Sequence, residues 1–132
     1  MGANDYPIPQ IHKKTWGIEE WFENNEKYCG KKLIVYSGLW SSEGKFHYHK
    51  IKDETFYIIG GELVLDIEVD GSIRRLLLAP GSSFRVKPGV KHRFTASNQR
   101  SDCEFIEVST THRDDDSYRC YWDKDKKEWA ED

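Results

Sequence analysis

Short runs of β-forming residues, separated by turn residues at even intervals, most restrict the fold of this chain. The clearest run is 62–69, in which leucine, isoleucine and valine occupy alternate positions and would share one buried face. The Asp70-Gly71 pair that follows is typical of a two-residue hairpin, and Pro80-Gly81 and Pro88-Gly89 mark later turns. Because no long helical pattern occurs, these runs predict an all-β sandwich or barrel.

The length and composition of the chain predict a single domain. It has 132 residues, of which 37% are hydrophobic and 14% aromatic, enough for one compact core. We expect residues 1–12 to form an N-terminal arm, 13–122 the β-barrel domain and 123–132 a charged C-terminal tail. A short helix is one expectation for 124–130 within the tail.

Charge and cysteine content exclude several classes of partner. The formal net charge is −3, with 20 basic and 23 acidic residues interspersed, so no broad positive field would recruit nucleic acid or an anionic membrane. No apolar run approaches the roughly 20 residues that span a bilayer, and residues 1–10 do not resemble a signal peptide. The three cysteines lack CxxC spacing, which indicates reduced structural thiols. We therefore expect a cytoplasmic protein.

A cluster of metal-binding residue types lies between two of the predicted strands. His47 and His49 are two residues apart, which on an extended strand places both imidazoles on one face, roughly 6 to 7 Å apart. Glu54 follows the polar turn 50–53 and begins the next strand, which ends at Gly60-Gly61. A hairpin at this turn would bring Glu54 beside the two histidines.

This spacing resembles the first motif of the cupins, small β-barrel proteins that hold a metal ion. The motif reads as His47, one residue, His49, four residues, Glu54, six residues and Gly61. Ser41 stands where the family has a glycine six residues before the first histidine. The resemblance implies a single-domain, all-β cupin with a jelly-roll barrel.

A second segment, 81–92, looks like the second cupin motif. In that motif a glycine turn and a Pro/Gly turn flank a short strand and deliver a further histidine, while Ala96 replaces an asparagine often found there. Three imidazoles and one carboxylate would then bind one divalent metal ion and leave positions open for substrate. The expected ligands are His47, His49, Glu54 and His92. This set suits Zn, Mn, Fe, Co or Ni.

Two further resemblances imply a reaction. The segment 105–111, followed by 114–116 and Arg119, resembles cupins of the D-lyxose isomerase type. Trp16-Gly17, followed by the metal motif, is similar to the cupin domain of type II phosphomannose isomerases. Both imply aldose–ketose isomerisation of a small carbohydrate or its phosphate. Because cupins commonly form homodimers, the resemblance also leads us to expect a homodimer.

Such an isomerisation needs a base that moves a proton between neighbouring carbons through an enediol. Glu107 is the candidate, because it would share the inward face of the last predicted strand with Phe105. If the strand instead turned its other face inward, Ile106 would be buried and Glu107 would lie outside. Lys45 precedes His47 by two residues, so it would either stabilise the enediolate or remain an ordinary solvated lysine.

The remaining candidates concern substrate binding. Arg85 and Arg119 offer forked donors for sugar hydroxyls or phosphate, and Asp116 could accept a sugar hydroxyl. His12 and His112 lie outside both motifs and are expected at the surface or rim. Two alternatives stay open from the sequence: an iron-dependent oxygenase, which would use the same ligands without a protein base, and a non-catalytic metal- and sugar-binding module.

Overall fold

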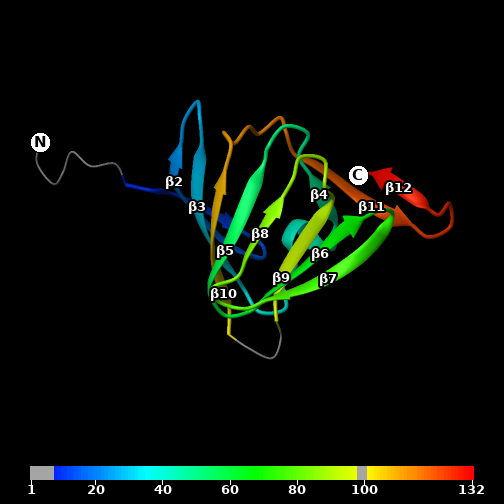
Figure 1. Ribbon diagram of the computed structural model, residues 1–132, viewed down its shortest axis with the longest axis horizontal. Helices are drawn as coiled ribbons and strands as arrows, with labels where there is room; N and C mark the ends of the chain where they lie inside the picture. The colour runs from blue at the N-terminus through cyan, green and yellow to red at the C-terminus, as the bar shows by residue number, and fades with distance from the viewer. Residues whose placement is uncertain (1–7, 98–100) are drawn as a thin grey trace, which may run out of the picture.

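Two antiparallel six-stranded sheets face each other in the computed structural model, which describes residues 8–97 and 101–132 (Figure 1). The first sheet contains, in spatial order, β1 (Gln10–Lys14), β2 (Gly17–Asn24), β3 (Cys29–Val35), β10 (Cys103–Ser109), β5 (Glu54–Gly60) and β8 (Ser83–Val86). The second contains β12 (Glu128–Glu131), β11 (Tyr118–Asp123), β4 (Phe46–Tyr48), β9 (His92–Ala96), β6 (Leu63–Val69) and β7 (Ser72–Leu78). The predicted all-β jelly roll is confirmed.

The hydrophobic core fills the space between the sheets at one end of the barrel. Phe56, Phe94 and Phe105 contact one another there, with ring centroids 4.9 to 6.0 Å apart. The alternating side chains of β6 join them, as the pattern in 62–69 predicts. At the turn after β6, both Asp70 and Gly71 have positive φ, 50° and 81°, as a type I′ hairpin requires.

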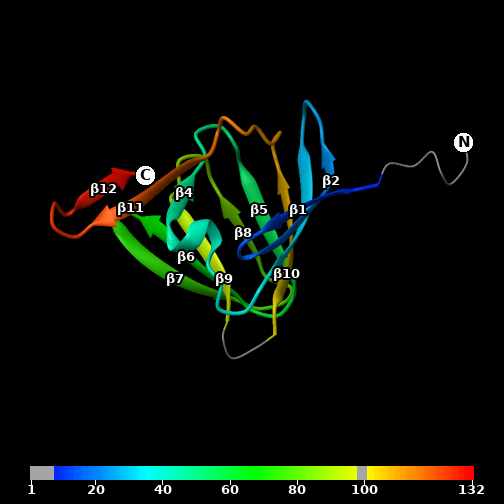
Figure 2. The same cartoon turned by 180° about the vertical axis from the view of Figure 1, so that it is seen from behind.

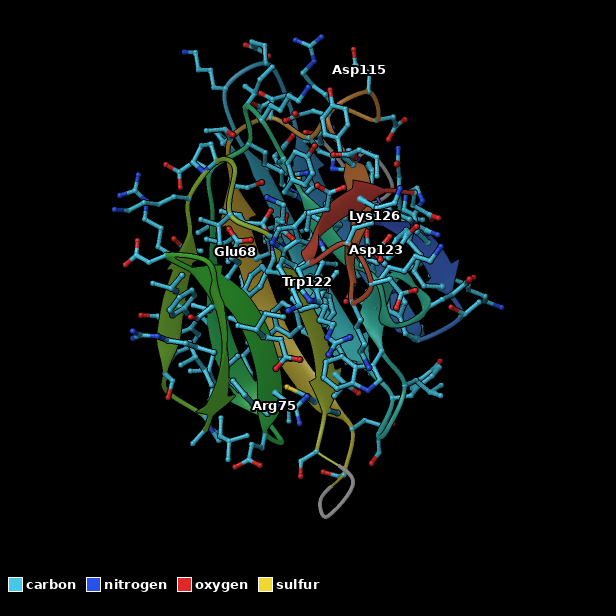
Figure 3. All side chains as sticks on the ribbon, turned by 90° about the vertical axis from the view of Figure 1, so that its right-hand side faces the viewer. Glu68, Arg75, Asp115, Trp122, Asp123 and Lys126 are labelled. Atoms are coloured by element: carbon cyan, nitrogen blue, oxygen red, sulfur yellow. The ribbon has the colours of Figure 1, made fainter. Side chains whose placement is uncertain are left out.

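The C-terminal segment forms a β-hairpin, so the helix expected at 124–130 is wrong. Strands β11 and β12 pair with Trp122 opposite Trp129, and β11 also pairs with β4. Trp129 packs edge-on against buried Phe46, with centroids 5.1 Å apart. Figure 3 shows the turn, where the Asp123 carboxylate accepts backbone N–H bonds from Asp125 and Lys126. Cross-strand aromatic contacts outweigh any local helical preference.

The N-terminal strands form one edge of the first sheet. Strand β1 begins at Gln10, inside the range expected to be an arm, and pairs with β2 (Figure 2). Residues 1–7 of that arm lie outside the described part. Trp16, in the turn between β1 and β2, is buried edge-on against Phe94. Within the described residues, no helix is long and apolar enough to cross a membrane.

Candidate metal centre and cavity

Three histidines from the second sheet converge at the open end of the barrel. His47 lies on β4, His49 directly follows that strand, and His92 begins the neighbouring β9. His47 and His92 are direct partners in the β4–β9 ladder, so their side chains share one face. One ring nitrogen from each histidine lies within 4.8 Å of the other two. This cluster is compact enough to hold a metal ion.

Backbone carbonyls orient two of these rings. His49 Nδ1 donates to the carbonyl of Asp116 at 2.6 Å, and His92 Nδ1 donates to the carbonyl of Val90 at 2.9 Å. These bonds assign the proton to Nδ1 and leave Nε2 of each ring as a lone-pair donor. Burial, together with the neighbouring imidazoles, lowers the pKa of His47 well below its usual value, and burial also lowers that of His49. Neutral imidazoles are the form that binds metal.

Glu54, the first residue of β5 and the fourth expected ligand, lies beside the three histidines. Its two carboxylate oxygens lie 3.4 Å from His49 Nε2 and from His92 Nε2. Although burial opposes ionisation, the charge of Lys52 holds the pKa of Glu54 below its usual value. Nδ1 of His47 and Nε2 of His92 are both buried without a hydrogen-bond partner among the described residues. Such orphaned donor atoms beside a carboxylate fit a divalent cation.

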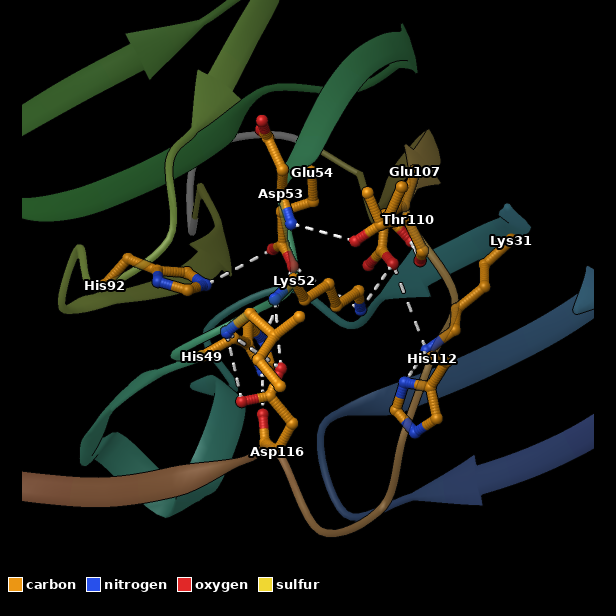
Figure 4. Close-up of polar contacts among 12 residues, drawn as sticks. Lys31, His49, Lys52, Asp53, Glu54, His92, Glu107, Thr110, His112 and Asp116 are labelled. Atoms are coloured by element: carbon orange, nitrogen blue, oxygen red, sulfur yellow. Dashed lines mark hydrogen bonds and ion pairs between the residues drawn. The ribbon is translucent and has the colours of Figure 1, made fainter. Parts of the chain in front are cut away.

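A cavity of about 510 Å³ opens above the histidines and is lined by both sheets. Glu107, on β10, is buried in its wall on the same strand face as Phe105. Lys52 Nζ lies 2.7 Å from the Glu107 carboxylate and 3.4 Å from that of Glu54 (Figure 4). Although burial works against it, the two carboxylates raise the pKa of Lys52. Lys52 thus links the base candidate to the metal centre as a buried cation.

A second buried lysine approaches Glu107 from β3. Lys31 Nζ lies 4.0 Å from Glu107 and 3.6 Å from Glu19, and it donates to His112 Nδ1 at 3.1 Å. Nε2 of His112 in turn donates to exposed Asp114 at 3.0 Å. Burial and the charge of Lys31 lower the pKa of His112. His112 therefore belongs to the cavity's polar network rather than to an isolated surface position.

An aromatic wall covers the outer side of this network. Trp21 stacks on His12 with ring centroids 4.1 Å apart, and it contacts His112 at 4.6 Å. The Lys31 ammonium lies 4.3 Å from the centre of the Trp21 ring. All four side chains line the cavity, so both histidines outside the motifs contribute to it.

The Asp116 carboxylate is buried and already hydrogen-bonded to the backbone, so the structure does not support its predicted contact with a sugar hydroxyl. Its carboxylate accepts backbone N–H bonds from Lys50, Ile51 and Lys52 at 2.8 to 3.3 Å. Together with the carbonyl bond to His49, these contacts fix the loop between the histidine motif and Glu54. Asp116 therefore anchors the loop behind the metal centre.

Two other candidates point away from the cavity. The ammonium of Lys45 pairs with the carboxylate of Asp132 near the C-terminus and does not line the cavity. Arg85 is exposed and forms two bonds to Asp53 at 3.0 and 2.6 Å. The predicted roles of Lys45 in catalysis and of Arg85 in substrate binding thus lack a geometric basis. Arg119, in contrast, lines the cavity.

Sequence reasoning missed both buried lysines. Lys52 lies in the predicted polar turn 50–53, although it precedes Glu54 by two residues and would share its side of an extended chain. Lys31 lies on the buried face of β3 with Cys29 and Leu33, which the alternation of that strand could have indicated. A lysine on a core-facing position is a signal of a buried ion pair.

The comparisons agree with this architecture. Residues 41–109, just over half of the chain, match the family model of the cupin domain, and the chain therefore belongs to the cupin family. A search of curated protein sequences gave no match. The cupin motifs, the jelly roll and the histidine cluster together define a metal-binding cupin.

Solved structures of other proteins share the fold at low identity. KdgF from Halomonas sp. is 17% identical with a TM-score of 0.64, over 86% of this chain and 95% of that one. Oxalate decarboxylase from Bacillus subtilis is 15% identical with a TM-score of 0.72, over 90% of this chain and 31% of that one. Fe(II)-HppE is 16% identical with a TM-score of 0.64, over 80% and 60%. This chain thus spans about a third of the decarboxylase.

Proposed function

We propose that this cupin is a metal-dependent isomerase that interconverts an aldose and a ketose, with Glu107 as the base. The observation that carries this proposal is a second buried carboxylate in the same cavity as the histidine cluster, held by two buried ammonium groups. A metal-binding module needs only the ligands. A second buried carboxylate beside them supplies a group that can accept and return a proton.

The metal site would be formed by His47, His49, His92 and Glu54, and a divalent ion there supplies Lewis-acid polarisation of the substrate oxygens. Glu107 removes the proton from the carbon next to the carbonyl, the C–H electron pair becomes the carbon–carbon double bond of the enediol, and the carbonyl π pair moves onto its own oxygen. The proton of the neighbouring hydroxyl passes to that oxygen, and Glu107 returns the carbon-bound proton to the former carbonyl carbon, so that the new carbonyl forms at the neighbouring carbon. Lys52, 2.7 Å from this carboxylate, holds it in place.

The cavity fits a small carbohydrate. Its volume of about 510 Å³ lies in the usual range for small-molecule sites, roughly 300 to 1,000 Å³. Gln10 and Glu19 place polar groups around this space, and Trp21 lies in its lining with His12 and Lys31 against its ring. Hydrogen-bonding groups around the cavity suit a ring or chain that carries many hydroxyls.

A screen of aldoses and aldose phosphates tests this proposal, with Mn, Zn, Co and Fe added separately to the metal-free protein. We expect conversion by the wild-type protein, loss of at least about 100-fold in Glu107→Gln with metal content unchanged, and loss of metal in His49→Ala. Glu104→Gln is the matched control, because Glu104 lies on the same strand but pairs with Lys32 outside the cavity.

Two outcomes would count against the isomerase. One is full activity in Glu107→Gln, which would remove the base. The other is an iron-loaded protein that consumes oxygen with a small organic substrate while leaving every sugar unchanged, which would favour the oxygenase.

A further inference from the structure

A smaller space of about 230 Å³, here called the outer lobe, lies beside the main cavity. The two spaces adjoin, because four residues line both of them: Lys14, Trp16, Ser42 and Arg119. Lys14 ends β1 in the first sheet, whereas Arg119 lies on β11 in the second. The outer lobe is therefore bounded by a cationic side chain from each sheet.

Arg119 lies beside the metal centre in the second sheet. It is the direct partner of His47 in the β4–β11 ladder, so the two side chains project from the same face of the sheet. A ligand that reaches His47 with one end can therefore reach the guanidinium with the other.

The cations deep in the main cavity are already compensated. Lys52 pairs with Glu54 and Glu107, and Lys31 pairs with Glu19 and Glu107. The charges of both lysines are thus neutralised by carboxylates of the protein.

The cations of the outer lobe are not paired with carboxylates in this way. Neither Lys14 nor Arg119 has a carboxylate within 4.0 Å among the described residues. Lys14 acts on Glu19 only at longer range, and that carboxylate is already bound to Lys31 and to Trp21 Nε1. Glu43 is the acidic residue in the lining of the lobe and forms no ion pair within the described part. With Lys13 also in the lining, the lobe carries an excess of positive charge.

We propose that the outer lobe binds the phosphate of a phosphorylated aldose, with Arg119 and Lys14 as its ligands. This inference rests on the proposed isomerase function and specifies its substrate class. A phosphate monoester carries a charge of about −1.5 to −2, which matches two uncompensated cations better than the single charge of a carboxylate does. The forked guanidinium suits two phosphate oxygens, while the ammonium of Lys14 contributes a point charge.

Binding is measured by titration calorimetry on the metal-loaded full chain, with an aldose 6-phosphate, the same free aldose and the corresponding uronate as probes. We expect the phosphate to bind at least about tenfold more tightly than the free aldose. Arg119→Gln and Lys14→Gln should each remove about tenfold of that affinity and leave the free aldose unaffected. Arg74→Gln is the control, because it removes an exposed arginine on β7 outside both spaces.

Equal affinity for phosphate and free aldose, or a preference that both substitutions leave intact, would overturn the phosphate site. Tighter binding of the uronate than of the phosphate would also overturn it. The failure of the phosphate site can be distinguished from the failure of the isomerase proposal. A phosphate preference that depends on Arg119, without turnover, supports the subsite and refutes the isomerase. Turnover of free aldoses without a phosphate preference refutes only the subsite.

Discussion

Replacing Asp116 with alanine should destabilise the fold and weaken the metal site together. The carboxylate accepts three backbone N–H bonds from the loop that joins His49 to Glu54. The Asp116 carbonyl also orients His49. Alanine keeps the carbonyl but removes the anchor that holds the loop around it.

The magnitude follows from these bonds. A hydrogen bond to a charged group contributes about 1.5 to 3 kcal/mol, and an unsatisfied buried donor costs about as much. Lys50 and Ile51 are exposed, so water can replace their bonds, whereas Lys52 is buried. We therefore expect a loss of about 2 to 4 kcal/mol in the free energy of unfolding. Disturbing the partner of a metal-binding histidine typically lowers metal affinity by 10- to 100-fold, and we expect about tenfold.

Urea unfolding of the metal-free protein and metal titration against a competing chelator measure the two effects. Asp115→Ala is the matched control, since the neighbouring carboxylate is exposed and pairs only with Arg113 among the described residues. It should change stability by less than about 0.5 kcal/mol. The reasoning is refuted if Asp116→Ala and Asp115→Ala behave alike in both measurements.

Two further predictions concern the barrel itself. Asp66 is buried between two arginines. Burial alone would raise its pKa, but the bonds from the arginines lower it. The stability that Asp66 adds to the fold is therefore complete above its pKa in the unfolded chain, about 4, and is lost as the pH falls from there through the lower pKa of the folded state. Unfolding of wild type and Asp66→Asn from pH 7 to pH 2 should show the gap closing in acid, and a constant gap would contradict this. Gly61 has φ +75°, and an added Cβ would lie 2.4 Å from the carbonyl oxygen of Asp102, so Gly61→Ala should cost at least about 2 kcal/mol. Gly60→Ala, where an added Cβ meets nothing within 4 Å among the described residues, is the control, and equal thermal shifts would show the reasoning wrong.

Much of the barrel could be predicted from local pattern. The alternation in 62–69 and the Asp70-Gly71 turn determine a hairpin within a few residues, so the sequence contains their full physical cause. The histidine cluster is similar, because the two-residue spacing of His47 and His49 fixes a shared side of the chain. His92 required the resemblance to a second motif, since its approach to His47 depends on a sheet pairing distant in sequence.

The parts that sequence reasoning missed depend on long-range pairing. Trp122 and Trp129 lie in a hairpin because β11 pairs with β4. The residues at 124–130 contain no local signal of this distant pairing. Asp116 resembles its acidic neighbours in sequence, and only the fold reveals that it faces three backbone donors. Lys52 required knowledge that two carboxylates meet inside one cavity.

The central claim is that Glu107 moves a carbon-bound proton beside the metal centre. A substrate aldose labelled with deuterium at C2 tests it directly, by NMR, in the metal-loaded wild type and in Glu107→Gln. We predict that the wild type removes deuterium from C2 as ketose forms. Glu107→Gln with full metal content should retain the label. Loss of the label at the wild-type rate in Glu107→Gln would contradict the assignment.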